Sequence, residues 1–220
     1  LTKSVEGVKL FDGFDFVVQR DQKIAFVGPM NQKKALFFEL LAGNEKPDAG
    51  SIEWGVTIRP SFFFRDNSRF FNEDRSIVEW LKQYSAIRDE TYVRGFLGRM
   101  LFTGEEATKS VKVLSGGERV RCMLSKMMLS EPNVLVMDEP TNHLDLEAIT
   151  ALNNGLVDFS EVVLFHSRDH QFVDTVANRI VEFTPEGTID RLMRFDDYLS
   201  SPEVQAERDA HYHAHSRQTL

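Results

Sequence analysis

The sequence predicts an α/β fold with a parallel sheet, because buried strands alternate with helices along the chain. Three continuous apolar runs, "KIAFVG", "NVLVMDEP" and "EVVLFHS", end at Gly28, at Asp138 with Glu139, and at Ser167. Such short, uninterrupted runs are typical of strands covered on both faces. After the second run, "DLEAITALNNGLVDF" has helical spacing and Asp145 as a predicted N-cap.

The remaining segments add elements around this core. The alternating stretch "VKLFDGFDFVVQ" predicts antiparallel strands that turn at Asp12-Gly13. "KKALFFELLAG" predicts a helix after the first run, and the turn-rich segment beyond it leads into a predicted short strand at Ser51–Trp54. Residues 66–130 are charged with helical spacing and are read as a helical insertion. The polar tail after Pro202 is expected to be partly disordered.

Composition limits the classes of protein that fit. The single cysteine, Cys122, excludes an internal disulfide scaffold and favours a reducing compartment, and a core position is expected for it. No apolar run approaches the ~20 residues of a membrane helix, and "LTKSVEGVKLFDGF" does not read as a signal peptide. A net charge of −8 argues against nucleic-acid binding over the whole surface. Leu1 suggests a fragment of a longer protein.

The stretch "GPMNQKKA" almost matches a P-loop, which reads Gly, four residues, Gly, Lys, then Ser or Thr. Gly28 and Lys34 are in place. Lys33 stands at the second glycine and Ala35 at the hydroxyl position. The strand before it and the helix after it are the context that a phosphate loop requires.

"LSGGE" places Ser115 three residues before Glu118, the spacing of a capping box. The backbone N–H groups of Gly116 and Gly117 lie at the positive end of the predicted helix and suit a terminal phosphate. A well-capped core helix without a ligand is the alternative.

Asp138 and Glu139 follow a buried strand, at the edge where α/β folds bind ligands. Asp138 is a candidate for holding Mg²⁺ through water, and Glu139 for acting as a base on an attacking water. The alternative is a helix-capping Asp with a surface Glu.

The ordered set LSGGE, VLVMDEP and TNHLD resembles the signature motif, Walker B strand and D-loop of ABC ATPases. "DEPTNHLD" resembles the spelling of the ABC-F class, soluble proteins with two ATPase domains, and "FHSRDHQF" and "EFTPEGTIDRLMRFDDYL" fit its switch region and domain end. The resemblance covers about residues 3–200. It implies a P-loop NTPase fold of the ABC-ATPase type over residues 1–200, with an antiparallel β subdomain, a helical subdomain at about 66–130 and a polar tail at 201–220.

The resemblance also implies function. ATP and Mg²⁺ are the expected cofactors, with Asp138 on the metal and Glu139 as catalytic base. A second ABC domain is the expected partner, in the same chain or as a homodimer, because ABC sites form head to tail between two domains. Ser115–Glu118 then complete the partner's site. The ribosome near its tRNA exit site and a cytoplasmic location are implied by the class.

Several positions depart from the family pattern. Asn31 and Lys33 replace loop glycines, and Ala35 lacks a metal-binding hydroxyl. Pro60 falls where the Q-loop glutamine is expected. Arg168 stands at the switch histidine, where it can contact a γ-phosphate but cannot accept a proton.

These losses predict weakened ATP binding, by ~100-fold or more if two or three charged hydrogen bonds are gone, and slow or absent hydrolysis at this domain's own site. His166 is a candidate substitute for the switch histidine, and Phe11 a candidate for stacking on adenine. The histidines of the tail are a candidate metal site: His211, His213 and His215.

Two other functions remain open. One is the ATPase subunit of a membrane transporter. The other is a degenerate, non-catalytic cassette that only completes its partner's ATP site.

Overall fold

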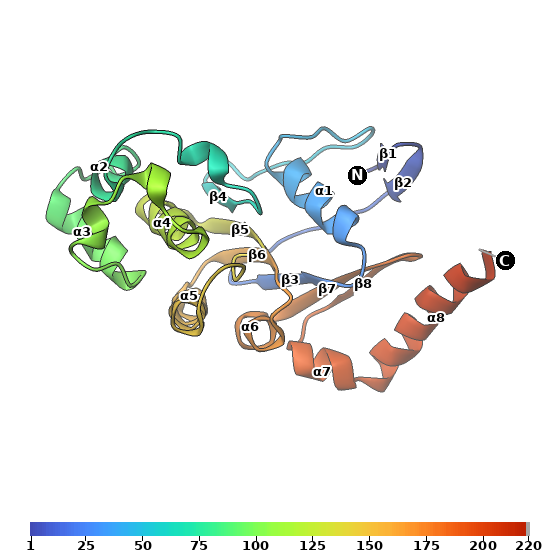
Figure 1. Cartoon of the computed structure of the whole chain (residues 1–220). Helices are drawn as coiled ribbons and strands as arrows, with labels where there is room; N and C mark the ends of the chain where they lie inside the picture. The colour runs from blue at the N-terminus through green and yellow to red at the C-terminus, as the bar shows by residue number, and fades with distance from the viewer. Residues whose placement is uncertain (219–220) are drawn as a thin grey trace. The chain divides into compact units, whose positions relative to one another are not determined.

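The computed structural model describes the backbone of residues 1–218 and the side chains of residues 1–212. The chain divides into two compact units, one made of residues 1–58 and 161–220 and the other of residues 59–160 (Figure 1). Each unit combines strands with helices. The α/β fold class predicted from the sequence is therefore confirmed.

The first unit is built on strand β3, which pairs in parallel with β6 on one side and β7 on the other. β8 extends this sheet antiparallel to β7. Ala25 of β3 lies opposite Phe165 and Ile180, and all three side chains are buried. Figure 1 shows α1 on one side of these strands and α6 and α7 on the other. The elements are β3 (Lys23–Val27), α1 (Asn31–Leu41), β6 (Val162–His166), α6 (His170–Val176), β7 (Arg179–Thr184), β8 (Gly187–Arg191), α7 (Phe195–Ser200) and α8 (Pro202–Gln218).

An antiparallel pair, β1 (Lys3–Val5) and β2 (Val8–Phe11), opens the chain as predicted, but its turn lies at Glu6-Gly7. Asp12-Gly13 comes after β2 and residues 14–19 form no strand, so the predicted turn and the strand after it are wrong. The strand predicted at Ser51–Trp54 is wrong. The Trp54 side chain is 36% exposed, so this apolar residue does not anchor a buried strand.

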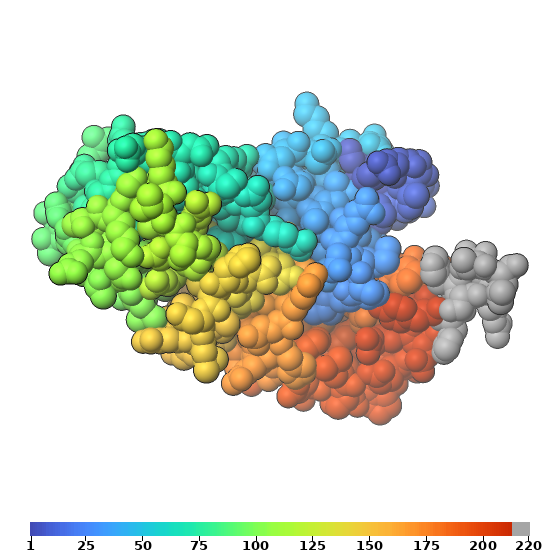
Figure 2. Space-filling view, viewed as in Figure 1, coloured from blue at the N-terminus to red at the C-terminus, as the bar shows by residue number. Residues whose placement is uncertain are grey.

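The second unit contains the parallel pair β4 and β5, with Phe63 opposite Met137 at its carboxyl end. Its helical segment forms the teal to yellow-green surface in Figure 2. α5 begins where Asp145 caps it, since the Asp145 carboxylate accepts the Ala148 N–H at 2.8 Å, as predicted. Cys122 of α4 is buried, and burial raises the pKa of its thiol. The elements are β4 (Pro60–Phe63), η1 (Ser68–Phe70), α2 (Ile77–Lys82), α3 (Glu90–Arg99), η2 (Glu106–Thr108), η3 (Val111–Val113), α4 (Gly116–Leu129), β5 (Val134–Asp138) and α5 (Leu146–Asp158).

The polar tail forms a helix, α8, so the prediction of disorder is wrong for the described residues up to 218. The helix is held by Glu182 of β7, which is only 1% exposed. The Glu182 carboxylate accepts the hydroxyls of Tyr198 at 2.6 Å and Tyr212 at 2.7 Å, and pairs with Nε of Arg208 at 2.9 Å. Burial, reinforced by the hydrogen bond to Glu182, raises the pKa of both tyrosines.

We expect Glu182→Ala to lower the free energy of unfolding by ~3 kcal/mol, because it leaves a guanidinium and two hydroxyls without their shared acceptor. Urea denaturation followed by circular dichroism measures this loss. Glu203→Ala is the matched control, since the Glu203 side chain is 85% exposed and lies 3.9 Å from Arg191. Equal midpoints for the two variants would contradict a role of Glu182 in holding α8.

Candidate functional site

The turn after β3 is fixed by a close approach of two backbones. Gly28 has a φ of +93°, and a Cβ at this position would lie 2.6 Å from the carbonyl oxygen of Phe183 on β7. Only glycine fits this conformation and this space. Three residues, Gly28 to Met30, separate β3 from α1, which begins at Asn31. The turn is therefore much shorter than a loop that wraps around phosphates.

The two lysines of the motif lie on the first turn of α1 and both are buried. Nζ of Lys34 donates to the carbonyl oxygen of Gly28 at 2.6 Å, so the side chain folds back onto its own turn. The Lys33 ammonium lies 5.1 Å from the ring centroid of Phe11 and 5.2 Å from that of Phe183. Burial lowers the pKa of Lys33. Phe11 is 1% exposed beneath this lysine, which leaves no open ring face for adenine.

The positions of Asn31 and Lys33 show the effect of replacing the two loop glycines. Asn31 and Lys33 are helical residues here, so the backbone that would curl around a phosphate is instead part of α1. The N-terminal end of a helix still favours an anion. Ala35, also in α1, presents a methyl group and brings no oxygen to a metal ion.

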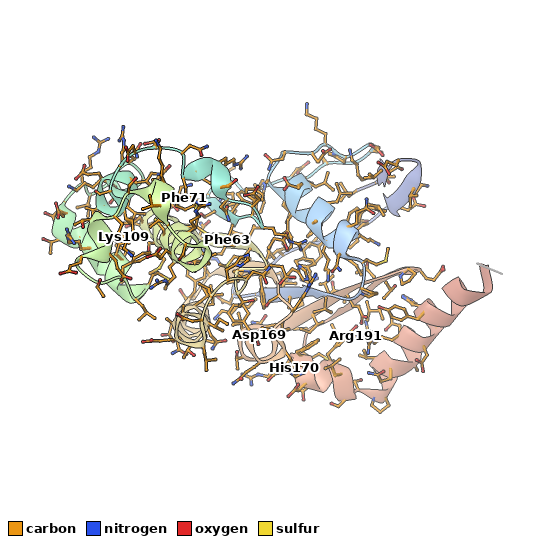
Figure 3. The ribbon with its side chains drawn as sticks, in the orientation of Figure 1. Phe63, Phe71, Lys109, Asp169, His170 and Arg191 are labelled. Carbon is orange, nitrogen blue, oxygen red and sulfur yellow. The ribbon has the colours of Figure 1, made fainter. Side chains whose placement is uncertain are left out.

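The signature segment forms the capping box that the sequence predicts. The Ser115 hydroxyl accepts the Glu118 N–H at 3.2 Å, and the Glu118 carboxylate accepts the Ser115 N–H at 2.8 Å. Lys109, labelled in Figure 3, donates to the same carboxylate at 2.7 Å. This hydrogen bond is the main reason that the pKa of Glu118 is lowered. Glu118 is thus committed to the helix terminus, and the backbone of Gly116 is exposed there.

His143 fits against the two glycines of this turn. A Cβ on Gly117 would lie 2.7 Å from the His143 carbonyl oxygen, whereas one on Gly116 would lie 3.4 Å from Cβ of His143, at ordinary contact distance. His143 itself has a φ of +65°. Gly117 is therefore required by packing within the second unit, while Gly116 is not.

Asp138 and Glu139 stand at the carboxyl end of β5, where the sequence predicts them, and both are buried. Glu139 has a φ of +53°, and its carbonyl accepts the Asn142 N–H at 3.2 Å. A non-glycine residue in the left-handed region is uncommon and costs energy, which is a pattern that clusters at functional positions.

The residue that reaches Asp138 is Arg65, which the sequence reading did not single out. Nη2 of Arg65 lies 3.6 Å from Oδ1 of Asp138. Pro60, expected near this carboxylate, lies opposite Val134 at the other end of the two strands, so the expected placement is corrected. Counting residues from a motif could not give this, because it depends on where β4 ends and on its register with β5.

Mg²⁺ requires several oxygen ligands in near-octahedral geometry. Within the second unit the residues do not fit this ion, because Pro60 lies at the other end of β4 and Asp138 has a guanidinium at ion-pair distance. A positive charge of the chain itself thus lies beside the carboxylate that was predicted to hold the metal ion.

The switch region lies between β6 and α6. His166 is the last residue of β6 and is buried, and Arg168 follows on an exposed turn. Asp169, labelled with His170 in Figure 3, caps α6 by accepting the Phe172 N–H at 3.0 Å. The two residues at the predicted switch therefore differ in exposure.

The histidines of the tail do not form a metal site among the described side chains. Nδ1 of His211 lies 2.9 Å from the Thr184 hydroxyl. The side chains of His213 and His215 lie outside the described residues. Within residues 1–218, no helix combines the length and apolar character that crossing a bilayer demands.

Solved structures share this fold. A putative metal-chelate type ABC transporter aligns over 92% of this chain and 83% of its own, with a TM-score of 0.69 and 21% identity. RNase-L inhibitor aligns over 86% of this chain and 37% of its own, with a TM-score of 0.69 and 23% identity. The archaeal recycling factor aABCE1, solved with the ribosomal stalk protein aP1, gives a TM-score of 0.65, with 24% identity over 75% and 32% of the chains.

Curated relatives are more similar in sequence. The uncharacterized ABC transporter ATP-binding protein YkpA of Bacillus subtilis is 52% identical over 93% of this chain and 38% of its own length. The probable ATP-binding protein YbiT of Escherichia coli O157:H7 is 37% identical over 93% and 39%. The energy-dependent translational throttle protein EttA of E. coli K12 is 32% identical over 86% and 35%.

This chain thus spans about two fifths of the length of these relatives. The family model described as "ABC transporter" matches residues 11–142, which include the turn at Gly28, the signature segment and the two acids at the carboxyl end of β5. The chain therefore belongs to the ABC transporter family of ATP-binding domains.

Proposed function

We propose that this chain is one of two ATP-binding cassettes in an ABC-F protein, and that ATP drives the two domains to close on each other and so regulates translation on the ribosome. In this proposal, the segment from Gly28 to Ala35 and Asp138 contribute to this domain's own ATP site. Ser115 to Glu118 complete the site of the partner domain. The similarity to EttA, whose name states a role in translation, supports the ribosome as target.

The observation that carries the proposal is the contrast between the two nucleotide-binding elements. The signature turn keeps its capping box, its exposed Gly116 and its close contact with His143. The phosphate turn, Gly28 to Met30, is short, and Lys34 donates to the Gly28 carbonyl within it. A signature turn that keeps the family pattern, together with a phosphate turn that departs from it, suits a domain whose own hydrolysis is impaired.

Arg168 supports the same assignment at the switch position. Its guanidinium stays protonated and can contact a γ-phosphate, but it cannot accept a proton from an attacking water. His166 contributes no exposed ring from β6. Glu139 thus has the position of a catalytic base, with Arg168 where the family pattern has a histidine.

Two alternatives have support of their own. The fold shared with a transporter over most of both chains favours the ATPase subunit of a membrane transporter. The short phosphate turn favours a degenerate, non-catalytic cassette that completes the partner domain's ATP site. The three readings differ in measurable ways.

ATP turnover by the isolated chain should be very slow, and Glu139→Gln should leave it unchanged, because the phosphate turn and switch position are altered. A coupled phosphate-release assay measures both proteins. A turnover typical of ATPases that Glu139→Gln abolishes would show an active site here and overturn the prediction of impaired hydrolysis.

Gly116→Asp in the two-domain protein should lower its ATP turnover by about tenfold or more, because a carboxylate at this turn repels a terminal phosphate by at least ~1.4 kcal/mol. The substitution should not harm the helix, since an acid in the first turn is favourable. Gly116→Ala adds volume without charge and is the matched control. Unchanged turnover in the aspartate variant would argue against the role of the signature turn.

The two-domain protein should sediment with ribosomes in a sucrose gradient when a non-hydrolysable ATP analogue is present, and not when ADP is present. The Gly116→Asp variant should lose this association, since closure needs ATP between the domains. Recovery in the membrane fraction, with no ribosome association under either condition, would favour the transporter alternative.

A further inference from the structure

We infer that Arg65 takes the place of a divalent cation beside Asp138, so that this domain binds ATP equally well with and without Mg²⁺. The inference rests on the proposed ATP binding by this chain and adds that this binding does not depend on Mg²⁺. It starts from the ion pair between Arg65 and Asp138, both of which belong to the second unit.

The register of β4 with β5 places Arg65 close to the Asp138 carboxylate. β4 and β5 run parallel, with Phe63 opposite Met137, so the chain leaving β4 emerges at the same edge as Asp138. Phe63 is labelled in Figure 3 at the end of its strand. Arg65 is the second residue beyond that strand, and its long side chain spans the remaining distance. The Asp138 side chain is 9% exposed and that of Arg65 48%, so the guanidinium closes the carboxylate off from one side and still reaches solvent.

The turn that carries Arg65 is held by its own hydrogen bonds. The Asn67 side chain donates to the Phe64 carbonyl and accepts the Phe64 N–H. The Asp66 carboxylate accepts the Ser68 N–H at 2.8 Å, and this hydrogen bond lowers the pKa of Asp66. The residues on both sides of Arg65 are therefore fixed, which limits the positions that its side chain can take.

The absence of a metal-binding hydroxyl at position 35 supports the replacement of the cation by Arg65. Ala35 cannot supply the hydroxyl that P-loop motifs place on Mg²⁺. A divalent cation at Asp138 would also be repelled by the guanidinium 3.6 Å from its oxygen. Arginine remains protonated at any physiological pH, and its planar fork suits both carboxylate and phosphate. One residue can thus neutralise Asp138 and present positive charge to a phosphate.

The test measures the ATP affinity of the chain by isothermal titration calorimetry, with excess MgCl₂ and with EDTA. Wild type should give dissociation constants that agree within about threefold, a difference below ~0.7 kcal/mol. Arg65→Ala should bind ATP about tenfold more weakly in EDTA and recover part of this loss in MgCl₂. Arg65→Lys, which keeps the charge, should stay independent of Mg²⁺.

Arg69→Ala is the matched control, because Arg69 lies in η1, just after this turn, but packs over the rings of Phe64 and Phe70, at 5.4 and 5.1 Å from their centroids. It should bind ATP as wild type does in both buffers. If wild type binds ATP tenfold more tightly in MgCl₂, the inference fails while ATP binding stands. If wild type binds in neither buffer, the proposed ATP binding fails and this inference with it. Arg65→Ala behaving like Arg69→Ala would also overturn it.

Discussion

The close approach of Gly28 to the β7 backbone is the constraint on which the first unit depends. Since a Cβ at Gly28 would lie 2.6 Å from the Phe183 carbonyl, the chain can leave β3 only through glycine in the left-handed region. The turn into α1 is then completed within three residues, and the first helical turn brings Lys33 over Phe11 and Phe183. A buried, desolvated cation is tolerated there because two ring faces lie against it.

The same strand, β7, links this turn to the end of the chain. Glu182 precedes Phe183, and its buried carboxylate is satisfied by Tyr198, Tyr212 and Arg208 from α7 and α8. An isolated carboxylate at this depth would be very costly. The residues of α7 and α8 that bind Glu182 therefore stabilise β7, and Glu182 in turn holds α8 in place. The polar composition of α8 is explained by this arrangement, because its anchors are a hydroxyl and a guanidinium rather than an apolar stripe.

Sequence patterns predicted the elements that depend on interactions between residues close together in the chain. Continuous apolar runs located the strands ending near Gly28, Asp138 and Ser167, and capping spacing located the helices after Ser115 and Asp145. Long-range contacts could not be read in this way. The tail looked disordered because Glu182, which holds it, is 30 residues away from Tyr212 in the sequence. Arg65 was missed because its position beside Asp138 depends on the register of β4 with β5.

The retention of Asp138 in a domain that has lost other metal ligands then has a physical reason. A buried carboxylate is costly unless a positive charge lies near it, and Arg65 supplies such a charge to Asp138. With Arg65 at ion-pair distance, Asp138 keeps an electrostatic role that needs no metal ion. Ala35 has no hydroxyl to offer a cation, whereas Arg65 places a positive charge of the chain itself beside Asp138.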